Sequence, residues 1–204
     1  MSPATRPLRL ERAKAPPVQT DKAAAILNAA LSLFVERGFH GTSIPEVAAR
    51  AAVGAGTIYR YFESKEALGN ALYRKCKEGL LALVLTDFPF HASTRDQFAA
   101  LWQRMGTWAK GAPLAFAFLE LHSHDSYLDE ESRALERRIV QFGVGFIESA
   151  QARGDLRTAP APILIGIVLG AFLGLQSRTR QCGYQATAAD WTLAEQCVWE
   201  AIRI

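Results

Sequence analysis

Apolar side chains recur every three to four positions along almost the whole chain, and no stretch alternates apolar and polar residues as a half-buried strand would. The first helical pattern follows Thr20, which can cap a helix that runs to Arg37. Gly38 comes directly after it, where helices often end in the left-handed conformation. The pattern predicts an all-α protein of about nine helices.

Residues 44–62 hold two short helical patterns with a turn of about three residues between them. Ser43 and Glu46 have the spacing of a capping box, so the first helix is expected from residue 44 to about Ala51. The second is expected over 55–62, anchored by Ile58 and Phe62. Two short helices joined by such a turn form a helix-turn-helix.

The remaining helices are expected to be longer. Ser64 can cap a helix that runs towards residue 86, and the pairs Thr94 with Gln97 and Thr187 with Asp190 repeat the capping-box spacing. The later helices are expected over about 95–110, 113–123, 130–153, 160–180 and 188–203.

Three segments are expected. Residues 1–19 carry four prolines and several basic side chains, which predicts a flexible basic arm that is either a set of phosphate contacts or a tail without a role. Residues 20–66 form the helix-turn-helix domain. Residues 67–204 form a second helical domain.

Composition narrows the class of protein. Half of the 204 residues are hydrophobic and 21% are charged, as in a globular chain. No apolar run reaches the ~18 residues of a membrane helix, and no signal peptide is expected. The three cysteines have no CxxC spacing, so neither a disulfide framework nor a zinc site is expected. These features predict a cytoplasmic protein that has no membrane contact.

Charge is distributed unevenly along the chain. Residues 1–78 hold 12 Lys/Arg and 7 Asp/Glu, a net charge of +5, whereas the remainder has a net charge of −2. The basic first third favours an anionic partner, although a chance asymmetry of solvated faces gives the same numbers.

The exposed face of the helix-turn-helix carries hydrogen-bond donors and no acidic residue. Arg60 suits a bidentate contact with guanine, Gly56 allows close approach of the backbone, and the hydroxyls of the two flanking tyrosines suit phosphates. Lys65 opens the next helix, where amides also point outward. The predicted DNA-contacting residues are Thr42, Ser43, Gly56, Thr57, Tyr59, Arg60, Tyr61 and Lys65. The alternative is an ordinary solvated face.

The stretch "GFHGTSIPEVAARAAVGAGTIYRYFESKEAL", residues 38–68, resembles the DNA-binding signature of the tetracycline-repressor (TetR/AcrR) family. The resemblance implies an all-α homodimer that binds a palindromic operator, usually as a repressor, and is released by a small molecule. Two positions depart from the family pattern. Ala52 stands where the turn usually has glycine, and Gly54 stands where it usually has serine.

The segment "ILIGIVLGAFLGL", residues 163–175, is apolar nearly all round, and glycines recur every four residues. Such a helix is buried either against a second copy of the chain or in the core of one subunit. The dimer interface is favoured, and its expected residues are Ile167, Gly170, Gly174, Trp191, Val198 and Ile202.

Aromatic residues gather between positions 98 and 146. They are either ordinary core or the lining of a pocket for a hydrophobic or aromatic effector. The predicted lining residues are Phe98, Trp102, Met105, Trp108, Phe116, His122, Gln141, Phe142 and Phe146.

Two other functions are weighed against this interpretation. One is a constitutive DNA-binding protein whose second domain only dimerises. The other is a metal-dependent hydrolase with ligands among Glu120, His122, His124 and Asp125, but residues two apart do not share a helical face. The sequence therefore predicts no catalytic residue, metal or cofactor.

Overall fold

The computed structural model describes residues 19–121, 123–181 and 183–204, and the predicted arm falls outside them except for Gln19. The described residues form nine α-helices and contain no strand beyond an isolated antiparallel bridge between Leu156 and Arg203. The helices are α1 (Gln19–Arg37), α2 (Ile44–Arg50), α3 (Ala55–Tyr59), α4 (Lys65–Leu85), α5 (Thr94–Gly111), α6 (Pro113–Leu121), α7 (Glu130–Ala152), α8 (Ala161–Gln181) and α9 (Ala188–Ile202).

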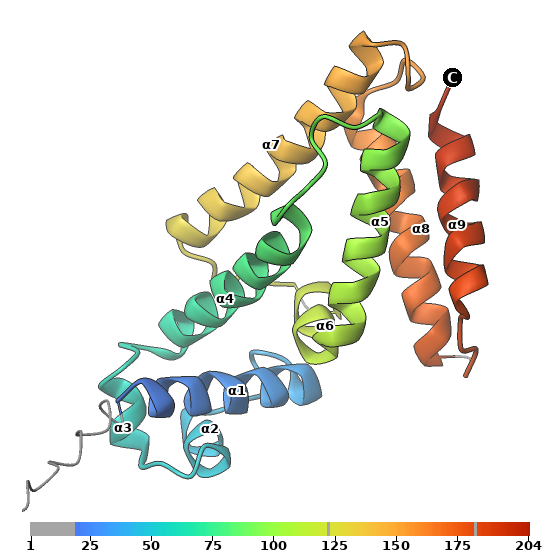
Figure 1. The fold of residues 1–204 in the computed structure, drawn as a ribbon. Helices are drawn as coiled ribbons and strands as arrows, with labels where there is room; N and C mark the ends of the chain where they lie inside the picture. Colours follow the sequence, from blue (N-terminus) through green and yellow to red (C-terminus); the bar gives the residue numbers. More distant parts are fainter. Residues whose placement is uncertain (1–18, 122, 182) are drawn as a thin grey trace, which may run out of the picture.

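The helices form two groups joined by α4. Helices α1, α2 and α3 lie together at one end, while α5, α8 and α9 stand side by side at the other end, and α7 runs alongside α4 (Figure 1). Helix α6 contacts α1, α4 and α5, so it lies at the junction of the two groups.

Each group has its own apolar core. The first core is built on fully buried side chains of α1, α3 and α4, among them Phe34, Ile58 and Leu68. It also takes in Phe118 of α6 and Tyr127 of the following loop. Because residues of α6 and of the loop after it complete the first core, this junction is packed directly against the first group.

The second core is aromatic. The Trp102 ring of α5 lies edge-on to Phe172 of α8 at 5.5 Å between centroids, and it is 6.1 Å from Trp191 of α9. Aromatic pairs in such arrangements gain about 0.5–1.5 kcal/mol beyond their area burial. These contacts fix α5, α8 and α9 to one another.

The predicted helix ends are mostly confirmed. Ser43 and Thr187 form capping boxes, and the Ser64 hydroxyl accepts from the Ala67 amide. The predicted cap at Thr94 is wrong by one residue, because the Ser93 hydroxyl accepts from the Asp96 amide. Gly38 adopts a left-handed φ of 74°, as the sequence predicts.

No helix in the described part of the chain is long and apolar enough to cross a membrane.

Candidate DNA interface

The turn of the helix-turn-helix carries both departures from the family pattern. Ala52 is left-handed, with φ 53°, a conformation that costs an L-residue with a Cβ about 1–2 kcal/mol. Gly54 occupies the N-cap of α3 and makes no side-chain cap bond. The Val53 amide donates to the Ala48 carbonyl at 3.0 Å, which holds the turn closed.

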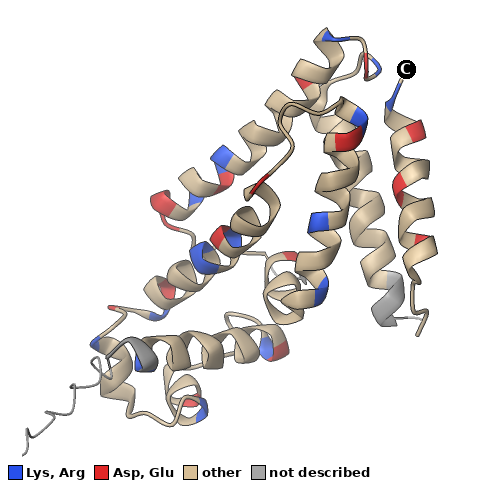
Figure 2. Ribbon diagram, in the orientation of Figure 1, with Lys and Arg blue, Asp and Glu red and all other residues tan. Residues whose placement is uncertain are grey.

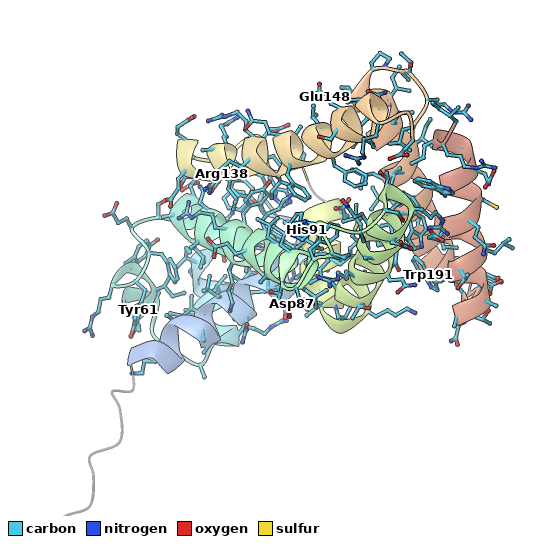
Figure 3. The ribbon with its side chains drawn as sticks, turned by 45° about the horizontal axis from the view of Figure 1, so that its top comes forward. Tyr61, Asp87, His91, Arg138, Glu148 and Trp191 are labelled. Atoms are coloured by element: carbon cyan, nitrogen blue, oxygen red, sulfur yellow. The ribbon has the colours of Figure 1, made fainter. Side chains whose placement is uncertain are left out.

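Helix α3 is anchored by one fully buried side chain and exposes one face. It ends at Tyr59 with Arg60 as its C-cap, so it is shorter than the predicted 55–62. Ile58 is fully buried, whereas Gly56, Tyr59 and Arg60 are exposed. Thr57 and Tyr61 are half-buried beside them, and Figure 3 shows Tyr61 at the end of the molecule farthest from Trp191.

Nothing lies within 4 Å of the Cβ position of Gly56, so this part of α3 presents bare backbone on its outer side. Tyr59 is 55% exposed, and no carboxylate pairs with Arg60 in the part of the chain described. A guanidinium that has no intramolecular partner keeps all five of its donors for a ligand. The arrangement suits contact with an anion or with base edges.

The predicted phosphate contact by the Thr42 hydroxyl is contradicted by its position. Thr42 is 2% exposed, and its hydroxyl lies 2.9 Å from the Gly38 carbonyl and 3.2 Å from that of Leu33. The hydroxyl therefore fixes the α1–α2 turn from inside. Ser43 is exposed, but its hydroxyl is engaged in the capping box with Glu46.

Two ion pairs remove other charges from this surface. Arg50 forms a two-pronged bridge to Glu36 at 2.8 and 3.0 Å, and Arg37 bridges Glu46. Hydrogen bonds from the Ser43 hydroxyl and amide hold the pKa of Glu46 below its usual value, and Arg37 contributes to the shift. The two carboxylates stay ionised but paired, whereas neither Arg60 nor Lys65 is in an ion pair within the described part of the chain.

The sequence did not reveal what Lys65 touches. Its ammonium lies 4.5 Å from the centroid of the Phe39 ring, and that ring stacks on Tyr127 at 4.0 Å. Close by, the His40 ring nitrogen lies 3.2 Å from the Ser126 hydroxyl. Phe39 and Tyr127 are 88 positions apart, so no local pattern could have paired them.

The predicted pocket residues divide into two sets. Phe98, Trp102, Trp108 and Phe116 are buried in the second core, with Met105 and Phe146 partly buried against it. Gln141 and Phe142 are exposed on α7, which contradicts their prediction as residues of an interior pocket. His122 lies outside the described residues.

Trp102 is the one unusual member of the buried set. It is 2% exposed, and its indole Nε1 is buried without a hydrogen-bond partner. Gln176 Nε2, one turn beyond Phe172 on α8, is in the same state. A buried donor left unsatisfied costs about 1–3 kcal/mol, so each of these atoms is suited to an acceptor from outside the chain.

The predicted dimer residues also divide. Ile167 is 40% exposed, and no atom lies within 4 Å of the Cβ positions of Gly170 and Gly174. Trp191 is only partly buried against the protomer's own core, so its place at the interface stays a prediction. Val198 and Ile202 are buried in that core, so their assignment to a partner surface is wrong. They lie on the inner side of α9, against α5 and α8.

The described residues include no group of three or more His, Cys, Asp or Glu side chains that could hold a metal ion. The two ring nitrogens of His124 lie 2.5 Å from the Tyr127 hydroxyl and 2.9 Å from the Phe118 carbonyl. The ring is thus held in a structural network.

Two family models match consecutive parts of the chain. "Bacterial regulatory proteins, tetR family" covers residues 26–72, and "Tetracyclin repressor-like, C-terminal domain" covers residues 73–204. The first match ends, and the second begins, inside the continuous helix α4.

Similar proteins agree with these matches. An HTH-type transcriptional repressor of Mycobacterium tuberculosis is 40% identical over 85 residues, 42% of this chain and 45% of that protein. The match thus spans less than half of that relative's length. A TetR family transcription regulator from Marinobacter aquaeolei has a TM-score of 0.80 at 22% identity, over 91% of this chain and 97% of that one.

A TetR-like transcriptional regulator from a Rhodococcus species has a TM-score of 0.71 at 20% identity, over 95% of this chain and 98% of that one. At these identities the solved structures show a shared fold. The two family models together span the described helices from within α1 to the C-terminal residue. The chain therefore belongs to the tetracycline-repressor (TetR) family of bacterial regulatory proteins.

Proposed function

We propose that this regulator is a repressor that binds a palindromic operator as a homodimer and leaves it when a hydrophobic or aromatic effector binds. The observation that carries the proposal is the outer face of α3, where bare backbone at Gly56 lies beside the exposed, unpaired Arg60. Such a regulator acts on chromosomal DNA, so the proposal places it in the cytoplasm.

The face of α3 supplies the groups that DNA reading requires. Arg60 can donate two hydrogen bonds to guanine O6 and N7 in the major groove. Tyr59, Tyr61 and Lys65 surround it and can reach phosphates, which fix the register of the protein on the duplex. Ser43 and Thr57 remain candidate contacts at the edge of the same surface.

Helix α8 supports the homodimer. Its residues 161–177 carry no charged side chain, and Figure 2 shows the described part of this helix without a charge. Its outer face exposes Ile163, Ile167 and Leu169 next to open glycine positions. An apolar, glycine-lined face lets a second copy of α8 approach closely. A twofold dimer would present two α3 helices to a twofold operator.

The second core supports the effector. An apolar interior with a few polar groups is typical of small-molecule sites. A flat ligand that carries an acceptor could satisfy Trp102 Nε1 or Gln176 Nε2, which lack partners in the described structure. The proposed lining combines Trp102 with Phe98, Met105, Trp108, Phe116 and Phe146.

The experiment is a selection of bound fragments from the source genome, followed by titration of the best site over a range of salt concentrations. We expect a palindromic site that binds two protomers. Arg60→Ala should weaken binding to this site by ~1–3 kcal/mol and relax the preference at one base pair. Lys75, an exposed cation on α4 away from α3, provides the control through Lys75→Ala. Equal losses on specific and random DNA would exclude a base contact by Arg60.

A constitutive DNA-binding protein is the second candidate, favoured by the exposure of Gln141 and Phe142 outside the core. A thermal-shift screen of hydrophobic and aromatic compounds separates the two. An effector present at 100 times its Kd would stabilise the protein by ~2.7 kcal/mol. A library with no stabilising compound would favour the constitutive protein.

A further inference from the structure

A ring stack joins the α1–α2 turn to the loop that follows α6. Phe39 and Tyr127 are each 7% exposed, and their rings lie 4.0 Å apart between centroids at an interplanar angle of 18°. Phe39 belongs to the DNA-binding end, and Tyr127 belongs to the α6–α7 loop, defined here as residues 123–129. The stack therefore crosses from one group to the other.

A positively charged group lies against the same Phe39 ring. The Lys65 ammonium lies 4.5 Å from the ring centroid, within the range of a cation–π interaction of about 0.5–2 kcal/mol. Lysine has a flexible four-carbon stem, so an ammonium that is held before binding loses less conformational entropy when it reaches a phosphate. The position of the Phe39 ring thus bears on how Lys65 meets DNA.

The α6–α7 loop is fixed to α4 just beyond Lys65. Asn70 is 2% exposed, and its amide nitrogen donates to the Tyr127 carbonyl at 2.8 Å. Its amide oxygen accepts from the Asp129 N–H at 2.9 Å. Arg74, one turn further along α4, bridges the Asp129 carboxylate at 2.9 Å. Loop and helix therefore move together at this point.

The loop is also fixed to α6. The His124 ring joins the Tyr127 hydroxyl, at 2.5 Å, to the Phe118 carbonyl of α6, at 2.9 Å. Phe118 also packs on Phe34 of α1 at 6.1 Å between ring centroids. A displacement of α6 would thus reach the Tyr127 ring through one histidine.

We propose that Tyr127 is a positioning residue for DNA binding: the α6–α7 loop holds the Phe39 ring, and through it the Lys65 ammonium, in place for a phosphate. This rests on the proposed function, because it requires Lys65 to contact DNA. It adds a route by which a change at α6, at the junction of the two groups, alters DNA affinity.

Two different substitutions can disrupt the stack of Phe39 and Tyr127. Tyr127→Leu removes one ring, while Tyr127→Phe keeps the ring and removes only the hydroxyl. Gly69 offers a second approach, since an added Cβ would lie 2.9 Å from Tyr127 Cε2 and 3.0 Å from Phe39 Cε2. Gly69→Ala should therefore displace at least one of the two rings, while alanine favours the interior of α4 by about 1 kcal/mol over glycine.

The test is a double-mutant cycle with Lys65→Ala, in which affinity for the selected operator is titrated against salt. Tyr127→Leu and Gly69→Ala should each weaken binding and lower the salt slope by about 0.9 per protomer, as Lys65→Ala does. In the Lys65→Ala background they should cause no further loss. Tyr127→Phe should keep the wild-type slope. Equal losses in both backgrounds, or a reduced slope for Tyr127→Phe, would overturn the proposal.

A second readout does not depend on DNA. The Phe39 ring should shift the proton resonances of the Lys65 side chain, and NMR of the free protein detects this shift. Loss of this shift in Tyr127→Leu or Gly69→Ala, but not in Tyr127→Phe, would support the positioning role of Tyr127. This readout holds even if the protein prefers no DNA site, and the absence of such a site would contradict only the proposed function. An unchanged shift in both Tyr127→Leu and Gly69→Ala would contradict the positioning role of Tyr127.

Discussion

At the scale of single residues, Ala52 stores strain that can be measured. Its φ of 53° favours glycine, whereas the preceding Ala51 has an ordinary φ of −82°. Ala52→Gly should raise the free energy of unfolding by about 0.5–1 kcal/mol, because relief of the left-handed strain exceeds the entropy that glycine adds to the unfolded chain. Urea denaturation measures the change. Ala51→Gly is the matched control and should lower stability.

The sequence alone predicts contacts within one helical turn better than contacts that depend on how the chain folds back on itself. Ser43 and Glu46 interact within one helical turn, so their spacing revealed the capping box. Whether the Thr42 hydroxyl points inward or outward depends on the carbonyls of Leu33 and Gly38, which the fold of the turn brings to it. Local spacing therefore predicts caps better than the direction of a side chain in a turn.

At the scale of elements, the short helix α3 combines weak helix formation with open backbone. Gly56→Ala should raise stability by up to about 1 kcal/mol, because alanine favours helix, yet weaken operator binding, because a methyl group would stand on the open face. Thermal unfolding and DNA titration give the two values. Gly79 on α4 is equally open and provides the control. Gly79→Ala should stabilise the protein and leave DNA affinity unchanged. Weaker operator binding by Gly79→Ala would contradict the view that the methyl group at residue 56 acts by obstructing the face of α3.

Helices α5 and α9 are joined by a charge pair in which the carboxylate is buried and the guanidinium is partly exposed. Glu195 is 5% exposed, and its carboxylate accepts two hydrogen bonds from the Arg95 guanidinium. Arg95→Met should lower the free energy of unfolding by about 2–3 kcal/mol, because it leaves a buried carboxylate unpaired. Denaturant titration checks this value. The double variant Arg95→Met/Glu195→Gln should recover part of the loss, since no unpaired charge remains, and the absence of recovery would contradict the assigned cause.

The element boundaries could be predicted closely, but the faces of the helices less well. Capping spacing and glycine placed most ends within one or two residues. The pattern of α9 is apolar on two sides, so the sequence could not tell that Val198 and Ile202 face the protomer's own core. The packing of Trp191 against Trp102 and Phe172 determines which side of α9 faces the core and which side faces outward.

At the scale of the whole molecule, the open face of α8 predicts a dimer that a single charge would break. Ile167→Asp should convert the homodimer to monomer and reduce operator affinity by at least an order of magnitude, because each half-site then binds alone. Analytical ultracentrifugation gives the mass. Val140 on α7 is also exposed, at 52%, so Val140→Asp is the matched control and should stay dimeric. A dimer that persists in Ile167→Asp would place the interface elsewhere.

The face of α8 also governs how gene control responds to the amount of regulator in a cell. When most copies are monomeric, the concentration of dimer rises with the square of the protomer concentration. Halving the protomer concentration, as happens when a cell doubles its volume without new synthesis, would then lower the dimer concentration about four-fold. The strength of dimerisation through the surface around Gly170 would thus set the concentration of the regulator below which the controlled genes are no longer repressed.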